Sequence, residues 1–555
     1  MRTIIAAAVM LVASFPAVGL ESTRQLLESG VAQLALDRVE RHQPREAADA
    51  RWGEWEIMRL RALTALSRYR DVLARVGADA SGFPERERRQ ALGLAARSAL
   101  EGGEPARARG YAARALWQGS PEPDEERALR MLVIESYLAE GNGQAAFRTM
   151  LRFAQDYHPV GSATAARFAE GLLALDMARE AANWLSRLEE GSPAKQMLRL
   201  KAGLVKPEAA IGQARALLAK GDSRGHWRVI AEAADRGGKP SIRIEALEQL
   251  TQQATDREDA RAAAARLWET YLASAARSAN VNHLLVGDDA AWATYASQRL
   301  QPDPFIARAF FAYLAQRAAT PQARQSAYLE LVLSLQKSRL ELVSLRLLEL
   351  GNIELNAISG EARYRLGTIA EAHDEAATAA RVWAGLAAPS GMTKAEWETR
   401  RALVLWRANE AEAAATTLAA AANEKQALPA KAVHVAISLG QAMVASGSAE
   451  PTDTSLAALL QLVGAKHQRE LLMALGDAAE KGGRFARAGS YFLQAALAPD
   501  GERAGATASK ARLAAALSLA RAGYKEDARA QLEWVIRHSR DAGEREVARK
   551  AQAKL

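Results

Sequence analysis

Cysteine is absent from the 555-residue sequence. This absence excludes disulfide bridges, thiol catalysis, cysteine-based zinc sites and a lipid-anchored N-terminal cysteine. Aromatic residues are scarce, at 6%, and no run alternates Val, Ile, Thr and aromatic residues between turn signals, as strands require. What is present is a chain that is 49% hydrophobic and rich in alanine, the residue with the highest helix propensity. The sequence therefore predicts an all-α protein.

The sequence motifs of common enzyme classes are also missing. No phosphate-binding loop, dinucleotide fingerprint, nucleophile elbow or H-E-x-x-H zinc motif occurs, and no two of the eight histidines lie four residues apart. The most suggestive carboxylate pair is Asp288-Asp289 beside Trp292, but acidic pairs are common throughout the chain. We therefore expect no catalytic residue, no metal ion and no cofactor.

The N-terminal segment, residues 1–19, has the pattern of an export signal. Arg2 supplies a positive start, residues 4–15 an apolar segment, and residues 17–19 (Ala-Val-Gly) a small-residue cleavage site before Leu20. The apolar segment is shorter than the roughly 20 residues that span a bilayer, and no later segment is apolar and uncharged over that length. Cleavage near Gly19/Leu20 would leave a protein with no transmembrane segment, and composition favours the periplasm of a Gram-negative bacterium.

The net charge of +8 comes from interleaved basic and acidic residues, as in "PERERRQ". Interleaving is typical of solvated helix faces with pairs four residues apart rather than of a nucleic-acid track. We therefore expect no nucleic-acid partner.

A spaced pattern of small and aromatic residues recurs along the chain. In "EKGGRFARAGSYFLQAALAPD" and the helix before it, the order is Gly476, Ala488, Phe492 and Ala495. The same order recurs with Gly367, Ala379 and Trp383, and further small residues in equivalent places are Ala108, Ala146, Ala181, Ala413 and Ala528. The step from Ala488 to Ala528 is longer than the step from Ala379 to Ala413, so the repeat is irregular.

This pattern resembles the tetratricopeptide-repeat superfamily, whose units of about 34 residues are antiparallel helix pairs with small residues at the helix crossings. The step from Ala379 to Ala413 matches that unit length. The resemblance implies a right-handed superhelical α-solenoid of tetratricopeptide-like hairpins. A break in rhythm over residues 280–305 suggests a junction between an N-terminal solenoid at 20–279 and a C-terminal solenoid at 306–555. Residues 446–455 form a second expected loop.

In this superfamily ligands usually lie in a concave groove lined by the first helix of each pair. When the groove positions of the superfamily are carried over one by one, the resemblance predicts an acidic groove with aromatic edges. Such a groove would bind a basic segment of a partner. Its expected residues are Tyr364, Glu371, Glu398, Trp406, Asp477 and Glu480.

The resulting functional prediction is a non-enzymatic periplasmic scaffold that binds proteins of the cell envelope, in envelope assembly, polysaccharide export or secretion. The alternative is an accessory superhelix in peptidoglycan metabolism that binds glycan or docks a hydrolase. The chain is broadly similar to the helical part of soluble lytic transglycosylases. It ends, however, in repeat and a basic tail, and the Glu-Ser pair and following segment of their catalytic domain do not occur there.

Overall fold

The computed structural model describes residues 20–118, 122–424, 427–445, 453–498 and 504–555. Within these ranges all regular structure is helical, and no strand is present. The prediction of an all-α protein is confirmed. None of the helices in the described ranges has the length and apolar character needed to cross a bilayer. The predicted export signal lies outside the described residues.

By its internal contacts the chain divides into two compact units between Gly238 and Lys239. In the first unit, residues 20–28 are helical. They are followed by α2 (Ala32–His42), α3 (Trp52–Ala65), α4 (Tyr69–Val76), α5 (Glu85–Glu101), α6 (Pro105–Trp117), α7 (Pro123–Ala139), α8 (Gly143–Asp156), α9 (Ser162–Leu173), α10 (Ala178–Leu185), α11 (Pro193–Lys201), α12 (Pro207–Leu217) and α13 (Ser223–Arg236).

The second unit begins with α14 (Pro240–Gln252), α15 (Arg257–Val281), α16 (Asp289–Arg299), α17 (Pro304–Arg317), α18 (Pro321–Lys337), α19 (Glu341–Glu349), η1 (Leu355–Ala357), α20 (Gly360–Ala372), α21 (Ala376–Trp383), α22 (Lys394–Arg407) and α23 (Ala411–Asn423). It continues with η2 (Ala430–Ala432), α24 (Val433–Ala445), α25 (Asp453–Lys481), α26 (Phe485–Leu497), α27 (Ala504–Arg521), α28 (Lys525–His538) and α29 (Ala542–Gln552).

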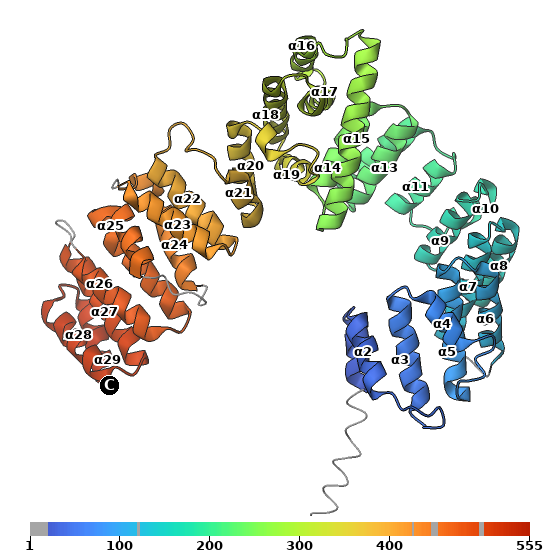
Figure 1. Ribbon diagram of the computed structural model, residues 1–555, viewed down its shortest axis with the longest axis horizontal. Coiled ribbons are helices and arrows are strands. Elements are labelled where there is room, and N and C mark those ends of the chain that lie inside the picture. Colours follow the sequence, from blue (N-terminus) through green and yellow to red (C-terminus); the bar gives the residue numbers. More distant parts are fainter. Residues whose placement is uncertain (1–19, 119–121, 425–426, 446–452, 499–503) are drawn as a thin grey trace, which may run out of the picture. The chain divides into compact units, whose positions relative to one another are not determined.

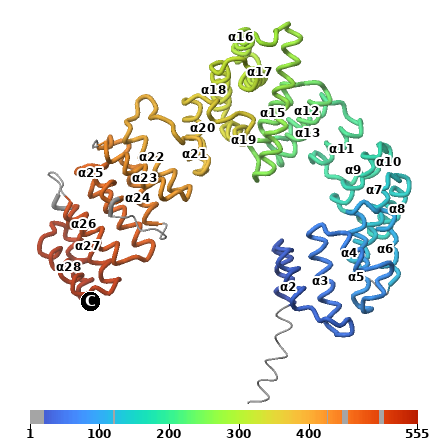
Figure 2. Tube along the Cα trace, viewed as in Figure 1, coloured from blue at the N-terminus to red at the C-terminus, as the bar shows by residue number. Residues whose placement is uncertain are grey.

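Within each unit the helices form successive hairpins. Each helix packs mainly against its neighbours in sequence, and the first helices of adjacent hairpins, such as α5 and α7 or α22 and α24, also meet. Figures 1 and 2 show this stacking of short helices. Because most contacts of a hairpin are with its neighbours along the chain, each unit is a solenoid.

The hairpin crossings follow the predicted register. A Cβ on Gly367 would lie 2.1 Å from the indole nitrogen of Trp383, and one on Gly476 would lie 2.4 Å from the ring of Phe492. Side chains almost never approach so closely, so glycine allows the aromatic residue of the second helix to pack on the first. The small residue and the aromatic residue of the repeat are therefore packing partners.

The alanines predicted at the crossings are buried, with one exception. Six of them have at most 1% of their surface exposed: Ala108, Ala146, Ala181, Ala379, Ala488 and Ala528. Ala413 is exposed instead, and its neighbour Ala414 is fully buried. The prediction for Ala413 is wrong by one residue, because α23 reads "AEAAATTLAAAAN" and the spacing of its alanines does not distinguish the buried face.

Where the first helix of a hairpin ends, one residue adopts the left-handed backbone conformation. In the hairpin of α25 and α26 this residue is Gly483, with φ 73°, and the Arg484 N–H then donates to the Ala479 carbonyl at 2.9 Å. Glycine adopts this conformation without a steric penalty. The Gly482-Gly483 pair is thus a hairpin turn.

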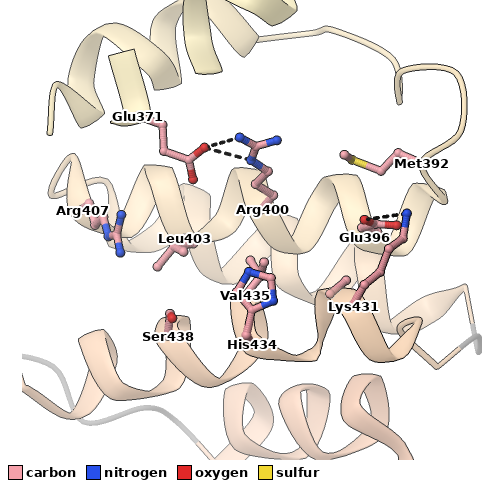
Figure 3. Close-up of a pocket in the computed structure, with 11 residues that line it drawn as sticks. Glu371, Met392, Glu396, Arg400, Leu403, Arg407, Lys431, His434, Val435 and Ser438 are labelled. Carbon is pink, nitrogen blue, oxygen red and sulfur yellow. Dashed lines mark hydrogen bonds and ion pairs between the residues drawn. The ribbon is translucent and has the colours of Figure 1, made fainter. Parts of the chain in front are cut away.

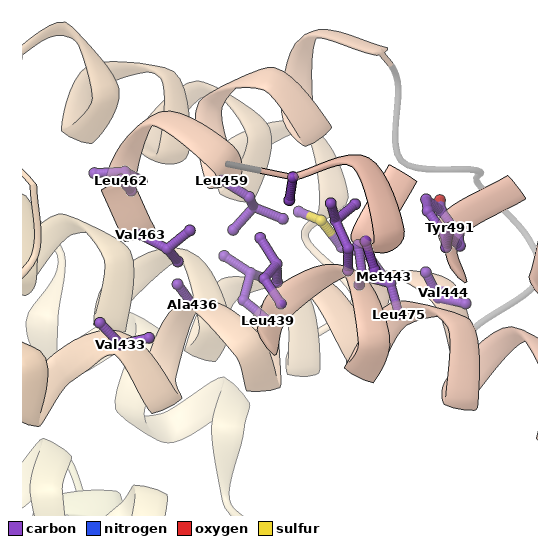
Figure 4. Packing of buried hydrophobic residues seen from close by; sticks show 14 of the residues in the cluster. Val433, Ala436, Leu439, Met443, Val444, Leu459, Leu462, Val463, Leu475 and Tyr491 are labelled. Atoms are coloured by element: carbon purple, nitrogen blue, oxygen red, sulfur yellow. The ribbon is translucent and has the colours of Figure 1, made fainter. Parts of the chain in front are cut away.

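The core of the second unit includes a continuous apolar cluster between α22 and α27. It contains residues from α22 to α27, and Figure 4 shows its central part, with Leu439, Met443, Leu459 and Leu475 in contact around α24 and α25. α25 is bent at Gly464, where φ is 65° and ψ 166°. The bend lets both halves of α25 contribute to the cluster.

The expected junction at 280–305 lies inside the second unit. α15 extends to Val281, and α16 packs on α17 through Trp292, which stacks on Tyr313 with ring centroids 4.4 Å apart. The contacts divide the chain earlier in the sequence, after Gly238.

A buried ion pair joins helices of this unit that are far apart in sequence. Glu248 of α14 and Arg308 of α17 are 0% and 1% exposed, and two hydrogen bonds of 2.6 and 2.7 Å connect them. The Tyr271 hydroxyl donates to the same carboxylate at 2.6 Å. Burial raises the pKa of the Glu248 carboxyl, whereas Arg308 and Tyr271 oppose that shift. The site is closed to solvent, so we regard this network as structural.

Candidate functional site

A cavity lies on the face formed by three successive first helices, α20, α22 and α24. Its volume is about 380 Å³, and it is lined by Glu371, Met392, Glu396, Arg400, Leu403, Arg407, Lys431, Ala432, His434, Val435 and Ser438. Figure 3 shows Glu371 entering from α20, Arg400 and Arg407 from α22, and His434 and Ser438 from α24. The cavity is thus built by side chains of three hairpins, on the face predicted for a groove.

Arg400 is held by several partners in this cavity. Its Nε donates to the Glu371 carboxylate at 2.9 Å, and Nη1 lies 3.3 Å from the Tyr364 hydroxyl. The guanidinium also lies over the ring of Trp383, 5.0 Å from the ring centre. Burial by itself lowers the pKa of Arg400, but the hydrogen bond and charge of Glu371 raise it above its ordinary value. Arg400 is therefore held as a fixed cation.

A second ion pair lies at the other side of the cavity. The Lys431 ammonium is 3.8 Å from the carboxylate of Glu396. Glu396 also lies in the first turn of α22, where its N–H donates to the Thr393 hydroxyl at 3.2 Å. Thr393 thus caps α22, and the Glu396 side chain is directed to Lys431.

Beside the two ion pairs the cavity has an apolar lining and, at the end of α22 away from Glu396, a further cation. Leu403 is buried, Val435 and Met392 are half-buried, and the Arg407 side chain is exposed. Arg407 makes no ion pair with any side chain in the part of the chain that the structure describes. The arrangement offers positive charge beside an apolar surface.

A second hollow of about 530 Å³ adjoins Tyr364. It is lined by the beginning of α20 and by the loop after α21, including Leu386 and Pro389. Tyr364 contacts this hollow with its ring and contacts Arg400 with its hydroxyl. Of the predicted groove residues, Tyr364 and Glu371 are thus brought together by Arg400.

Glu398 and Trp406 do not line the cavity. Glu398 pairs with Arg401 at 2.8 Å on its own helix, and Trp406 is half-buried against the apolar cluster of the second unit. The slip of one residue in α23 explains the outcome for Glu398 but not for Trp406, which keeps a groove position in the shifted register and packs against the apolar cluster instead. When Ala414 replaces Ala413 as the buried residue, Glu396, Leu403 and Arg407 move into the groove positions, and these residues do line the cavity.

Asp477 and Glu480 lie on the first helix of a later hairpin. Asp477 is exposed and pairs with no side chain among the described residues, whereas Glu480 forms an ion pair with Arg521 of the next first helix. Three of the four predicted groove carboxylates, Glu371, Glu398 and Glu480, are therefore paired with arginines of the chain itself.

The sequence interpretation did not identify Arg400, Lys431 and His434 as cavity residues. For Arg400 and Lys431, the signal in the sequence is a basic residue about one repeat after a carboxylate of the same face. Arg400 follows Glu371 by 29 residues, and Lys431 follows Glu396 at a similar interval. The predicted groove positions were taken from one repeat unit at a time. They therefore leave out an oppositely charged residue that the following unit contributes.

Other candidate chemistry has structural explanations. Asp288 accepts from the Ala291 N–H at 3.1 Å at the start of α16, and Asp289 accepts from the Ala319 N–H at 2.7 Å. Across the described ranges, no group of three or more His, Asp or Glu side chains is arranged to hold a metal ion.

Comparison with known proteins adds little to these observations. No family model and no curated protein matches this sequence. Among solved structures, the APC/C hetero-tetramer Cut9–Hcn1 aligns over 99% of both chains at 12% identity, with a TM-score of 0.33. Naa15/Naa10 bound to HypK-THB aligns over 98% of this chain and 97% of its own at 14% identity, with a TM-score of 0.20. Yeast Tom70 covers 85% of this chain and 97% of its own at 11% identity, also with a TM-score of 0.20.

Such low TM-scores do not establish a common fold. The fold is therefore described from the hairpins themselves. Gly367 under Trp383 and Gly476 under Phe492 repeat one crossing in two hairpins. The protein is an all-α solenoid of tetratricopeptide-like hairpins. Its second unit carries a cavity on the first-helix face.

Proposed function

We propose that this protein is an exported scaffold of the bacterial cell envelope that binds a partner protein along the first-helix face of its second unit. The observation that carries the proposal is the cavity between α20, α22 and α24, because three hairpins contribute side chains to it. A ligand there contacts several repeats at once, as solenoid surfaces allow.

The chemistry of the cavity suits binding rather than catalysis. Four of its charged groups are paired across hairpins, Arg400 with Glu371 and Lys431 with Glu396. Its floor is apolar, and its open position on the surface gives an extended segment access. Binding surfaces typically have an apolar centre that is surrounded by a few fixed polar groups. The cavity has this composition.

The setting of this scaffold is the periplasm, in envelope assembly, polysaccharide export or secretion. The export pattern of residues 1–19 and the absence of cysteine support this part of the proposal. In this setting the protein acts by holding partners and carries out no reaction of its own.

The test is crosslinked capture from a periplasmic extract with two matched variants. Ser438→Trp fills the cavity with an indole, whereas Ser490→Trp adds the same group to an exposed position of α26. We expect wild type and Ser490→Trp to enrich the same envelope protein and Ser438→Trp to lose it. Equal capture by both variants would refute the groove as the binding site, and retention on purified sacculi without any protein partner would favour a role in peptidoglycan metabolism.

A further inference from the structure

The carboxylates of the cavity already face cations of the chain itself. Glu371 is engaged by Arg400 through two guanidinium nitrogens, and Glu396 faces Lys431. A basic segment entering the cavity would have to displace these internal cations. A basic partner was expected because the groove carboxylates were taken to have no cationic partner within the chain. In the cavity they do have such partners, so this reason for a basic partner no longer holds there.

The charge that remains in the cavity is positive. Its lining contains three permanent cations, Arg400, Arg407 and Lys431, against the two carboxylates of Glu371 and Glu396. Arg407 projects from the last turn of α22 and is exposed. It has no ion-pair partner in the described ranges, so its charge is available to a ligand.

Arg400 is positioned before any ligand arrives. Its contacts with Glu371, the Tyr364 hydroxyl and the face of Trp383 fix the guanidinium plane. A fixed cation loses little conformational freedom when an anion approaches, and this favours binding. Arg400 and Arg407 lie on the same face of α22, separated by about two helical turns.

We propose that the cavity binds an acidic segment of the partner protein, with a carboxylate near Arg407 and an apolar side chain on the floor formed by Leu403, Val435 and Met392. This inference rests on the proposed function and specifies the chemistry of its partner. Opposite charges across an interface select partners and speed their association, and like charges exclude the wrong ones.

The test uses two short fluorescein-labelled peptides of equal length with the full chain. In one peptide Glu and Leu alternate, and in the other Lys replaces each Glu. We expect fluorescence anisotropy to show binding of the acidic peptide, with affinity that falls at ~1 M salt, where the screening length is about 3 Å. The basic peptide should bind at least about tenfold more weakly.

Arg407→Glu should weaken binding of the acidic peptide by about tenfold or more. Arg179→Glu is the matched control, because Arg179 is an exposed arginine in the first unit and its replacement changes the net charge equally. An equal loss in both variants would show a general charge effect and overturn the proposal. Preference for the basic peptide, or binding of neither peptide, would also overturn it.

The same variants separate this inference from the proposed function. If wild type and Arg407→Glu capture the same partner equally from periplasmic extract while Ser438→Trp does not, the groove binds its partner but not through acidic groups. Loss of capture in both cavity variants, with Arg179→Glu unaffected, supports both conclusions.

Discussion

Small side chains determine where the helices of this protein cross. Gly476 lies beneath the ring of Phe492, and Ala488, one turn before that ring, is fully buried. Neither position has room for additional atoms, because protein interiors are packed at the density of organic crystals. The residues that define the repeat therefore act through their volume.

Ala488→Leu should destabilise the second unit by roughly 1–3 kcal/mol, because the added carbon atoms overpack the crossing between α25 and α26. The matched variant is Ala486→Leu, two residues earlier on the same helix, where the side chain is exposed. It should change the free energy of unfolding by no more than about 0.5 kcal/mol. Urea unfolding measures both variants, and similar losses for the two would show that the crossing is placed wrongly.

At the scale of helices, charges link successive hairpins along the first-helix face. In the first unit Glu135 of α7 lies 3.0 Å from Arg97 of α5 and 2.7 Å from Arg167 of α9. In the second unit Glu371 and Arg400 connect α20 to α22. Pairs that solvent still reaches contribute roughly 0–1 kcal/mol each, and these partly buried pairs also set the arrangement of charge on the first-helix face.

The buried pair of Glu248 and Arg308 should behave differently. Arg308→Met leaves a carboxylate without its counter-ion inside the protein and should cost about 3–5 kcal/mol. The double variant Glu248→Leu/Arg308→Met removes both charges and should recover a large part of that loss, because desolvation of the pair offsets much of its attraction. A double-mutant cycle in urea measures the coupling.

Arg365→Met is the control for this cycle. Arg365 pairs with Glu361 on the surface of α20 at 2.8 Å, and its replacement should cost no more than about 1 kcal/mol. Additive effects of the Glu248 and Arg308 substitutions would contradict the account of the pair as one coupled unit.

At the scale of the whole molecule, the chain consists of two compact units with separate apolar cores. Clusters from α2 to α7 and from α7 to α11 belong to the first unit, and the cluster from α22 to α27 belongs to the second. Because the stability of a solenoid is close to a sum of local terms, effects of cavity substitutions should stay within the second unit.

Export can be tested on the whole protein. We expect the chain purified from a periplasmic extract to begin at Leu20, because Ala17, Val18 and Gly19 form the small-residue cleavage site. N-terminal sequencing provides the measurement. Recovery of the chain from the cytoplasm with Met1 retained would contradict both the export signal and the envelope setting of the proposed function.

The sequence by itself determined the helical class, the hairpin repeat and most of the buried crossings. Those features are local, since a glycine or alanine at a fixed distance from an aromatic residue is needed wherever two helices cross closely. Gly367, Ala379 and Trp383 could therefore be placed correctly before the structure was known. The same reasoning selected Tyr364 and Glu371, which line two neighbouring hollows beside α20.

Only the tertiary structure decided which alanine of α23 is buried and which charges meet across hairpins. In a helix with alanine at most positions, the buried face is chosen by the neighbouring helices, so Ala414 rather than Ala413 is enclosed. That single step puts Glu396 rather than Glu398 at a groove position and adds Arg407, and both Glu396 and Arg407 line the cavity. The sign of the net charge in the groove depends on contacts such as that of Arg400 with Glu371. Residues so far apart in sequence become neighbours only when the irregular repeats stack.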